Sequence, residues 1–291
     1  MNENYALDPD APADVRELKL LLDQFGLQTG RFLSRYPDDW SALLLQRMEG
    51  ASQMERARAI DILARRRGYL VPTSAPYQRS TGWANNAAVA AERHRAFGSV
   101  IGRSGNGFGW PSVVQVLYED DHALPVGAGA HLPMQAAQYV ECVRPLFLAS
   151  AEVFLVDTYF TLRTRSGEPD RQRWQVLVAF LKLAEEVGTC EVLRLILARD
   201  RIDETEGSES RLEDDIGTAL EQSGTKRIEV LYEIRHDVGH GRYIFSLHGG
   251  LQFDQGFQEH RTKRNHVHWL SRPELNPLLD RFGRSTSLAV R

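Results

Sequence analysis

The chain has 291 residues, of which 42% are hydrophobic, 25% charged and 9% aromatic, and its formal net charge at pH 7 is −4. This composition is typical of a globular protein and excludes a disordered or fibrous chain. The two cysteines, Cys142 and Cys190, are too few for a disulfide scaffold or a cysteine-rich zinc module. The net charge argues against nucleic-acid binding by the whole surface, although a local basic patch stays compatible with it.

The sequence contains no segment that resembles a membrane span. The longest apolar runs, at residues 153–156 and 176–181, are far shorter than the roughly 20 residues that a span needs. No basic segment at the N-terminus leads into an apolar stretch, as it would in a secretory signal. We therefore expect a cytoplasmic, bacterial protein that does not contact a membrane.

Residues 1–75 predict a helical region. Residues 1–12 contain two prolines and are expected to be a flexible lead-in. Apolar side chains at helical spacing then predict a helix that begins near Asp14 and another that begins after Pro37. A third helix follows Ser52, which has the spacing of a capping box with Glu55.

The third of these helices, predicted over residues 53–67, is rich in arginine. Its cations could contact phosphate or a partner, or they could form a solvated face that complements the helix C-terminus. Residues 1–75 hold ten Lys and Arg against eleven Asp and Glu. This near-balance favours the solvated face, because a nucleic-acid helix normally lies in a basic field.

Residues 135–291 predict an α/β layer. Strands alternate with helices up to about residue 232, which indicates a largely parallel sheet, and shorter strands then indicate an antiparallel end. The acidic stretch at 199–215 is expected to be a solvated loop rather than a metal site. The predicted strands are 152–156, 191–198, 227–232, 242–247, 251–253 and 266–270, and the predicted helices are 135–150, 171–187, 211–222 and 273–282.

The predicted fold class is thus α/β, in three segments. A helical region over residues 1–75 is followed by an irregular and helical connection over 76–134, with one helix at 83–95. The third segment, residues 135–291, carries a mixed sheet flanked by helices.

Three motifs of the third segment resemble a known family. The first predicted strand ends in V-D-T-Y-F at residues 156–160, a later strand opens with H-G-R-Y-I-F at 240–245, and G-G-L-Q-F-D-Q-G-F follows at 249–257. Over residues 135–285 the chain resembles a divergent bacterial branch of the phospholipase D-like fold. In that fold the first strand ends in an Asp-Pro-Tyr-like tripeptide, and an H-x-R/K-Y strand leads into a glycine-rich hairpin. The N-terminal half does not share the resemblance.

The resemblance implies a phosphate site at His240 and Arg242. Active members carry the motif H-x-K-x-x-x-x-D, in which the histidine attacks phosphorus and the lysine stabilises the oxyanion. His240 matches the nucleophile, Arg242 replaces the lysine, and Leu247 occupies the position of the aspartate, where it cannot orient a histidine. Only one motif is present, so an active site would require a homodimer. A substitute carboxylate would have to come from elsewhere, the candidates being Asp237, Asp254 and Glu233.

The C-terminal end is locally basic. Residues 226–291 hold eleven Lys and Arg against seven Asp and Glu. Within them, basic residues interleaved with rings suit contact with a nucleic-acid backbone together with base stacking. An ordinary charged loop at a sheet edge is the alternative. The basic residues are Arg261, Lys263 and Arg264, and the neighbouring rings belong to His260, His266 and Trp269.

Two histidine pairs have the spacing of metal ligands. His236 and His240 are four residues apart, and His266 and His268 would share one face of a strand. Neither pair has a third ligand at a diagnostic spacing. We predict no metal and no cofactor.

The leading hypothesis is a non-catalytic, phospholipase D-like subunit that binds nucleic acid or acts as an adaptor. Its partners would be DNA or RNA, proteins of a multi-subunit complex, or both, and the resemblance suggests an antiviral defence or mobile-element system. His240 and Arg242 would contact phosphate and Asp157 would fix the strand end. The groove would be extended by Arg261, Lys263 and Arg264.

Two alternatives stay open. The first is a dimeric, metal-independent phosphodiesterase or nuclease that uses His240 of each subunit. The second is a protein–protein scaffold in which the basic segment pairs with an acidic partner and no nucleic acid is involved.

Overall fold

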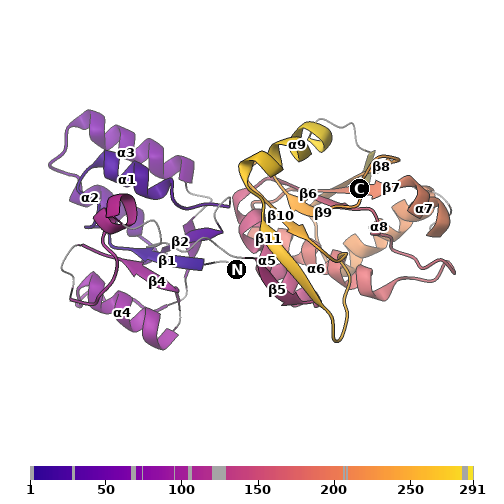
Figure 1. Ribbon diagram of the computed structural model, residues 1–291, viewed down its shortest axis with the longest axis horizontal. Helices are drawn as coiled ribbons and strands as arrows, with labels where there is room; N and C mark the ends of the chain where they lie inside the picture. The colour runs from indigo at the N-terminus through magenta and orange to yellow at the C-terminus, as the bar shows by residue number, and fades with distance from the viewer. Residues whose placement is uncertain are drawn as a thin grey trace. The chain divides into compact units, whose positions relative to one another are not determined.

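The computed structural model describes residues 3–27, 30–66, 70–73, 75–94, 96–103, 107–119, 129–205, 207, 209–283 and 288–290. Contacts divide the chain into two compact units, Asn2–Ala128 and Gly129–Arg291 (Figure 1). Each unit is built on a sheet flanked by helices, so the α/β class is confirmed. Within these ranges, no helix is both long enough and apolar enough to cross a membrane.

The N-terminal unit contains a four-stranded parallel sheet in the order β3-β2-β1-β4. Helices α1, α2 and α3 pack on one face, around the buried Trp40, and α4 packs on the other (Figure 1). The elements are β1 (Glu3–Leu7), α1 (Val15–Leu22), β2 (Arg31–Arg35), α2 (Trp40–Arg47), α3 (Gln53–Arg66), β3 (Leu70–Pro72), α4 (Trp83–His94), β4 (Ser99–Ile101) and the π-helix Gln115–Glu119.

The three helices predicted before residue 75 are present, and the capping box of α3 is confirmed. The Ser52 backbone N–H donates to the Glu55 carboxylate at 3.0 Å, and the Glu55 N–H donates to the Ser52 hydroxyl at 3.3 Å. The prediction of a purely helical region with a flexible lead-in is wrong, because β1, β2 and β3 lie in it. Strands of three to five residues are too short for a two-residue alternation to stand out from the helical pattern around them.

The sheet also joins segments that were predicted to be separate. Strand β4 follows residue 76 yet pairs with β1, so residues 1–75 and the connecting region contribute to one sheet. The contacts place the division between the units after Ala128, rather than after residue 134.

The C-terminal unit contains an eight-stranded mixed sheet in the order β12-β8-β7-β6-β9-β10-β11-β5. Strands β6, β7 and β8 are parallel, and β9, β10 and β11 follow in antiparallel pairs, as predicted. Strand β5 adds to β11, also antiparallel. The elements are β5 (Ala130–Pro133), α5 (Ala136–Ala149), β6 (Glu152–Asp157), α6 (Arg171–Val187), β7 (Val192–Ala198), α7 (Arg199–Thr205), α8 (Glu209–Ser223), β8 (Glu229–Arg235), β9 (Arg242–Phe245), β10 (Gly250–Phe253), β11 (Arg264–Trp269), α9 (Arg272–Phe282) and β12 (Leu288–Val290).

Helix α9 packs on one face of this sheet, while α5, α6 and α8 lie on the other (Figure 1). Helix α6 is capped at its N-terminus by Asp170, whose carboxylate accepts from the Gln172 and Arg173 N–H groups. Its C-terminal cap is Gly188, whose positive φ of 70° suits that position. Helix α5 continues through Pro145 to Ala149.

Residues 199–205 and 209–215, which were expected to lie in an acidic loop, are instead helical, in α7 and the start of α8. Arginine side chains offset the acidic run locally. The Arg199 guanidinium lies 2.6 Å from the Glu209 carboxylate and 3.9 Å from that of Asp203. Strands β5 and β12, which the sequence did not predict, are the two outermost strands of the sheet.

The core between α9 and the sheet centres on two stacked rings, Phe154 and Phe245, whose centroids are 4.9 Å apart. Replacing Phe245 with alanine removes a fully buried ring, so we expect Phe245→Ala to lower the free energy of unfolding by about 3–5 kcal/mol in urea denaturation. Leu247, two residues later, is 63% exposed. Leu247→Ala should change the free energy by less than about 0.5 kcal/mol. Equal effects of the two substitutions would contradict this packing.

Candidate nucleic-acid interface

The carboxyl ends of β6, β7 and β8 meet at one edge of the sheet, and β9 begins at the same edge. Register pairs run across it in one row, from Asp157 to Arg242, to Phe253, to Val267 and to Ala130. In open α/β sheets, ligands bind outside the carboxyl ends of the parallel strands. This edge is therefore the candidate site.

A buried carboxylate organises the edge. Asp157 is fully buried, and its Oδ1 accepts from the Tyr159 N–H at 2.8 Å while its Oδ2 accepts from the Phe257 N–H at 3.1 Å. The Arg242 Nε lies 3.7 Å from Oδ1. Burial raises the pKa of Asp157 above 3.8, and the two N–H groups and the charges of Arg242 and Arg173 oppose this effect. The carboxylate thus connects the end of β6 to the loop after β10.

The Arg242 side chain is largely used within the fold. Its Nη1 donates to the Asp254 carbonyl at 2.7 Å, and its guanidinium lies 5.2 Å from the centre of the Tyr159 ring. Arg201, from α7, lies over the same ring at 4.8 Å. Two cations therefore stack on one tyrosine at the carboxyl ends of β6 and β7. Tyr159 lies in the V-D-T-Y-F motif, but neither it nor Arg201 was predicted as a site residue, although both closely follow predicted strands.

His240 is exposed in the loop before β9, at the same edge as Arg242. In the part of the chain that the structure describes, its ring has no hydrogen-bond or ion-pair partner. The backbone next to it is held, because the Thr158 hydroxyl donates to the Gly239 carbonyl. Leu247 lies in the turn after β9, at the opposite end of that strand from Arg242.

The other three predicted basic residues lie near the start of β11. Arg264 begins the strand, and its Nη2 donates to the His131 carbonyl of β5 at 2.8 Å. Arg261 and Lys263 are exposed in the preceding loop. Arg261 also lines a cavity of about 530 Å³, together with Met134, Gln135, Ala137, Gln172, Gln175, Glu259 and His260.

The register places these basic residues at the same edge as Arg242. Arg242 pairs with Phe253, which pairs with Val267, and Arg264 precedes Val267 by three residues along β11. Strands β9 and β11 are two strand spacings apart, or about 9.6 Å. The edge therefore carries His240, Arg201, Arg242, Arg261, Lys263 and Arg264.

Two of the rings predicted to stack with bases do not face solvent freely. Trp269 is only 7% exposed. His260 is half-buried, and its Nδ1 accepts from the Thr262 and Lys263 N–H groups at 3.3 and 3.2 Å. His266 is also partly exposed, and its ring nitrogens accept no backbone N–H from the described residues, unlike Nδ1 of His260.

No metal centre is assembled in the described ranges, where no group of three or more His, Cys, Asp or Glu side chains could hold an ion. His236 lies 3.7 Å from the Asp200 carboxylate. His266 and His268 share one face of β11, as predicted from their spacing.

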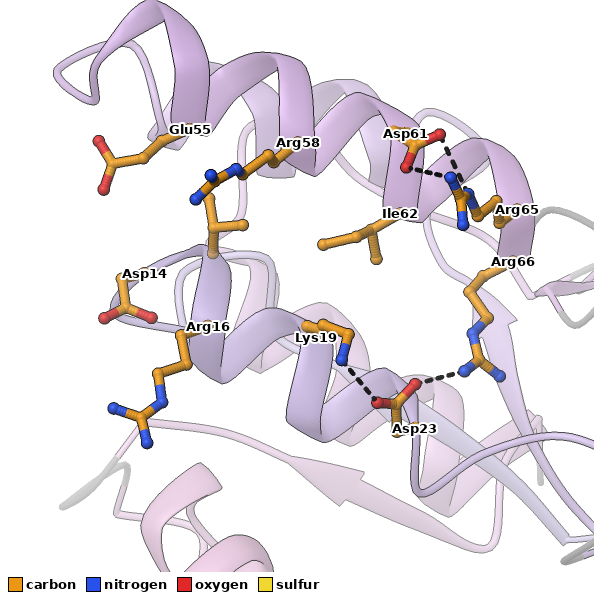
Figure 2. A pocket seen from close by; sticks show the side chains of 11 residues that line it. Asp14, Arg16, Lys19, Asp23, Glu55, Arg58, Asp61, Ile62, Arg65 and Arg66 are labelled. Atoms are coloured by element: carbon orange, nitrogen blue, oxygen red, sulfur yellow. Dashed lines mark hydrogen bonds and ion pairs between the residues drawn. The ribbon is translucent and has the colours of Figure 1, made fainter.

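A cavity of about 690 Å³ lies between α1 and α3 of the N-terminal unit (Figure 2). Charges of both signs alternate along it. Asp61 pairs with Arg65 at 3.0 Å, and Asp23 pairs with Lys19 at 3.7 Å and also with Arg66. This mutual pairing supports the solvated face that we expected for the arginine-rich helix. The remaining lining residues are Asp14, Val15, Arg16, Glu55, Arg58 and Ile62.

No protein-family model and no curated protein sequence matches the chain.

Removing Arg242 leaves the fully buried Asp157 carboxylate without its neighbouring opposite charge. We expect Arg242→Ala to lower the free energy of unfolding by about 3–5 kcal/mol at pH 7. Chemical denaturation measures the change. Arg261→Ala removes an exposed cation from the same edge and should alter stability by less than about 0.5 kcal/mol. If Arg242→Ala were as mild as Arg261→Ala, Arg242 would not compensate the buried charge.

The raised pKa of Asp157 also predicts a pH dependence. The native carboxyl keeps its proton to a higher pH than the unfolded one, so stability falls as the pH rises from 3.8 through the native pKa. The variant Asp157→Asn has no titratable group at this position. Its free energy of unfolding should therefore lack this contribution to the dependence on pH. Urea unfolding of both proteins between about pH 3.5 and 7 gives the difference. Parallel stability curves would show that burial does not raise this pKa.

Proposed function

We propose that the C-terminal unit binds nucleic acid at the carboxyl edge of its sheet, where β6, β7 and β8 end, and does not cleave it. The observation that carries the proposal is the gathering of basic side chains at one edge. Arg261, Lys263 and Arg264 are exposed there, and Arg201 and Arg242 lie at the same edge. Phosphate contacts of this kind supply affinity for DNA or RNA without reading its sequence.

The absence of cleavage is inferred from the surroundings of His240 and Arg242. A nucleophilic histidine needs a hydrogen-bonded group that fixes its tautomer, and no described carboxylate is within hydrogen-bond distance of His240. Arg242 is already engaged by Asp157, the Asp254 carbonyl and the Tyr159 ring. Both features argue against phosphodiester chemistry at this position, and they leave phosphate binding mainly to the exposed cations of the same edge.

The phospholipase D-like resemblance is part of this proposal. Two of its motifs lie side by side, since β6, which ends at Asp157, pairs with β9, which begins at Arg242. The third motif forms β10 and the loop after it, and β10 pairs with β9. This adjacency supports the resemblance, and with it a role as a nucleic-acid-binding or adaptor subunit of a larger complex.

Binding is tested by fluorescence anisotropy of labelled single- and double-stranded DNA and RNA over a range of salt concentrations. We expect affinity that falls steeply with salt. The variant Arg261→Ala/Lys263→Ala/Arg264→Ala should bind more weakly, and its logarithmic salt slope should be smaller by about 2–3, because each phosphate contact contributes about one.

A control with the same charge change comes from the N-terminal unit. The variant Arg56→Ala/Arg58→Ala/Arg65→Ala removes three exposed cations of α3 and should keep the wild-type salt slope. Equal losses in both variants would indicate non-specific attraction rather than the proposed edge.

The same samples, run on a denaturing gel, test the alternatives. Intact probes support a binding protein, whereas cleavage that disappears in His240→Ala would establish the nuclease. No binding to any probe at low salt would exclude both and leave the protein scaffold.

A further inference from the structure

One face of the antiparallel half of the C-terminal sheet carries three histidines. Helix α9 covers the other half of this face, packing on Phe154, Phe245 and their neighbours. Along β11, Asn265, Val267 and Trp269 are buried, and the residues that alternate with them point to the opposite face. The residues on that face are Arg264, His266 and His268.

The rings form a contiguous row across β5 and β11. His131 is the cross-strand partner of His266, with ring centroids 4.9 Å apart, and His268 follows on β11 with its ring 5.9 Å from that of His266. His131 is exposed, and His266 and His268 are partly exposed. The row therefore presents imidazole surface to solvent.

The orientation of the central ring is fixed by its neighbours. A Cβ on residue 129 would lie 2.5 Å from Nε2 of His266, so only a glycine leaves room for the ring there. On the other side, the Asp254 carboxylate lies 3.6 Å from Nδ1 of His266. The ring is thus held in place between β5 and β10.

Basic side chains continue the row toward the side of the sheet where β6, β7 and β8 end. Arg264 lies on the same face of β11, two residues before His266, and its guanidinium donates to the carbonyl of His131. Lys263 and Arg261 precede it in the loop. Exposed rings beside a line of basic side chains match the chemistry that binds single strands, in which bases stack on rings and cations follow the phosphates.

We propose that this face binds single-stranded nucleic acid, with bases stacked on His131, His266 and His268 and phosphates bound by Arg264 and Lys263. The inference rests on the proposed function and adds to it a preference for single-stranded over double-stranded nucleic acid. In a duplex the bases are stacked on each other and paired, so they cannot lie on a sheet face.

The test compares a labelled single strand with a duplex of the same length by anisotropy. The variant His131→Ala/His266→Ala/His268→Ala should bind the single strand about tenfold more weakly or worse, with little change for the duplex. The variant His131→Phe/His266→Phe/His268→Phe keeps flat rings without nitrogen atoms and should retain single-strand binding. Loss in both variants would point to hydrogen bonding or charge and overturn the stacking assignment.

The control is His94→Ala, which removes an exposed histidine of α4 in the N-terminal unit and should leave both affinities unchanged. Circular dichroism establishes that each variant is folded. If the triple variant does not fold, His131→Ala alone, at an exposed position of the edge strand β5, should still weaken single-strand binding several-fold.

Failure of this inference is distinguishable from failure of the proposed function. Equal affinities for single strand and duplex, together with unchanged binding by the histidine variants, would overturn the strand preference and leave binding at the basic edge intact. Absence of binding to every probe would overturn both.

Discussion

The buried carboxylate of Asp157 is the constraint on which the functional edge depends. It accepts hydrogen bonds from the chain after β6 and from the loop after β10. One side chain therefore holds two segments of backbone that are distant in sequence. A buried charge requires an opposite one nearby, and Arg242 supplies it. Because Arg242 is held in this way, contact with an external phosphate depends mainly on residues that remain exposed.

The two halves of the C-terminal sheet differ in how they are covered. The parallel strands β6, β7 and β8 are joined by helical connections, and their two faces are covered by α6 and α8 on one side and by α9 on the other. The antiparallel strands are joined mainly by loops and hairpins, so part of one face is left to solvent. The proposed phosphate contacts are made by basic residues at the carboxyl ends of the strands. The proposed base contacts are made by imidazoles on the face that no helix covers.

The features that the sequence predicted well are those with strong local signals. Strand β6 contains a continuous run of four apolar residues, 153–156, and α6 has both an N-terminal cap at Asp170 and a glycine at its C-terminus. The strands of the N-terminal sheet are too short to show a clear alternation of apolar and polar residues. The hydrophobic periodicity of that region therefore comes mainly from the helices around them.

The parts of the site that were missed depend on long-range pairing. His131 and His266 are 135 positions apart in the chain and meet only because β5 adds to the edge at β11. The stacking of Arg201 and Arg242 on Tyr159 likewise joins three separate elements. Local spacing carries no information about such contacts, whereas the nearby cluster of Arg261, Lys263 and Arg264 was visible because its members are close in sequence.

Photo-crosslinking of a single-stranded oligonucleotide carrying photoreactive bases, followed by mapping of the crosslinked peptides, tests the central claim most directly. The account predicts crosslinks in β11 and the loop before it, around residues 260–268, and in β5 at His131. Crosslinks confined to α1 and α3 of the N-terminal unit would contradict it, because those helices would then provide the binding surface.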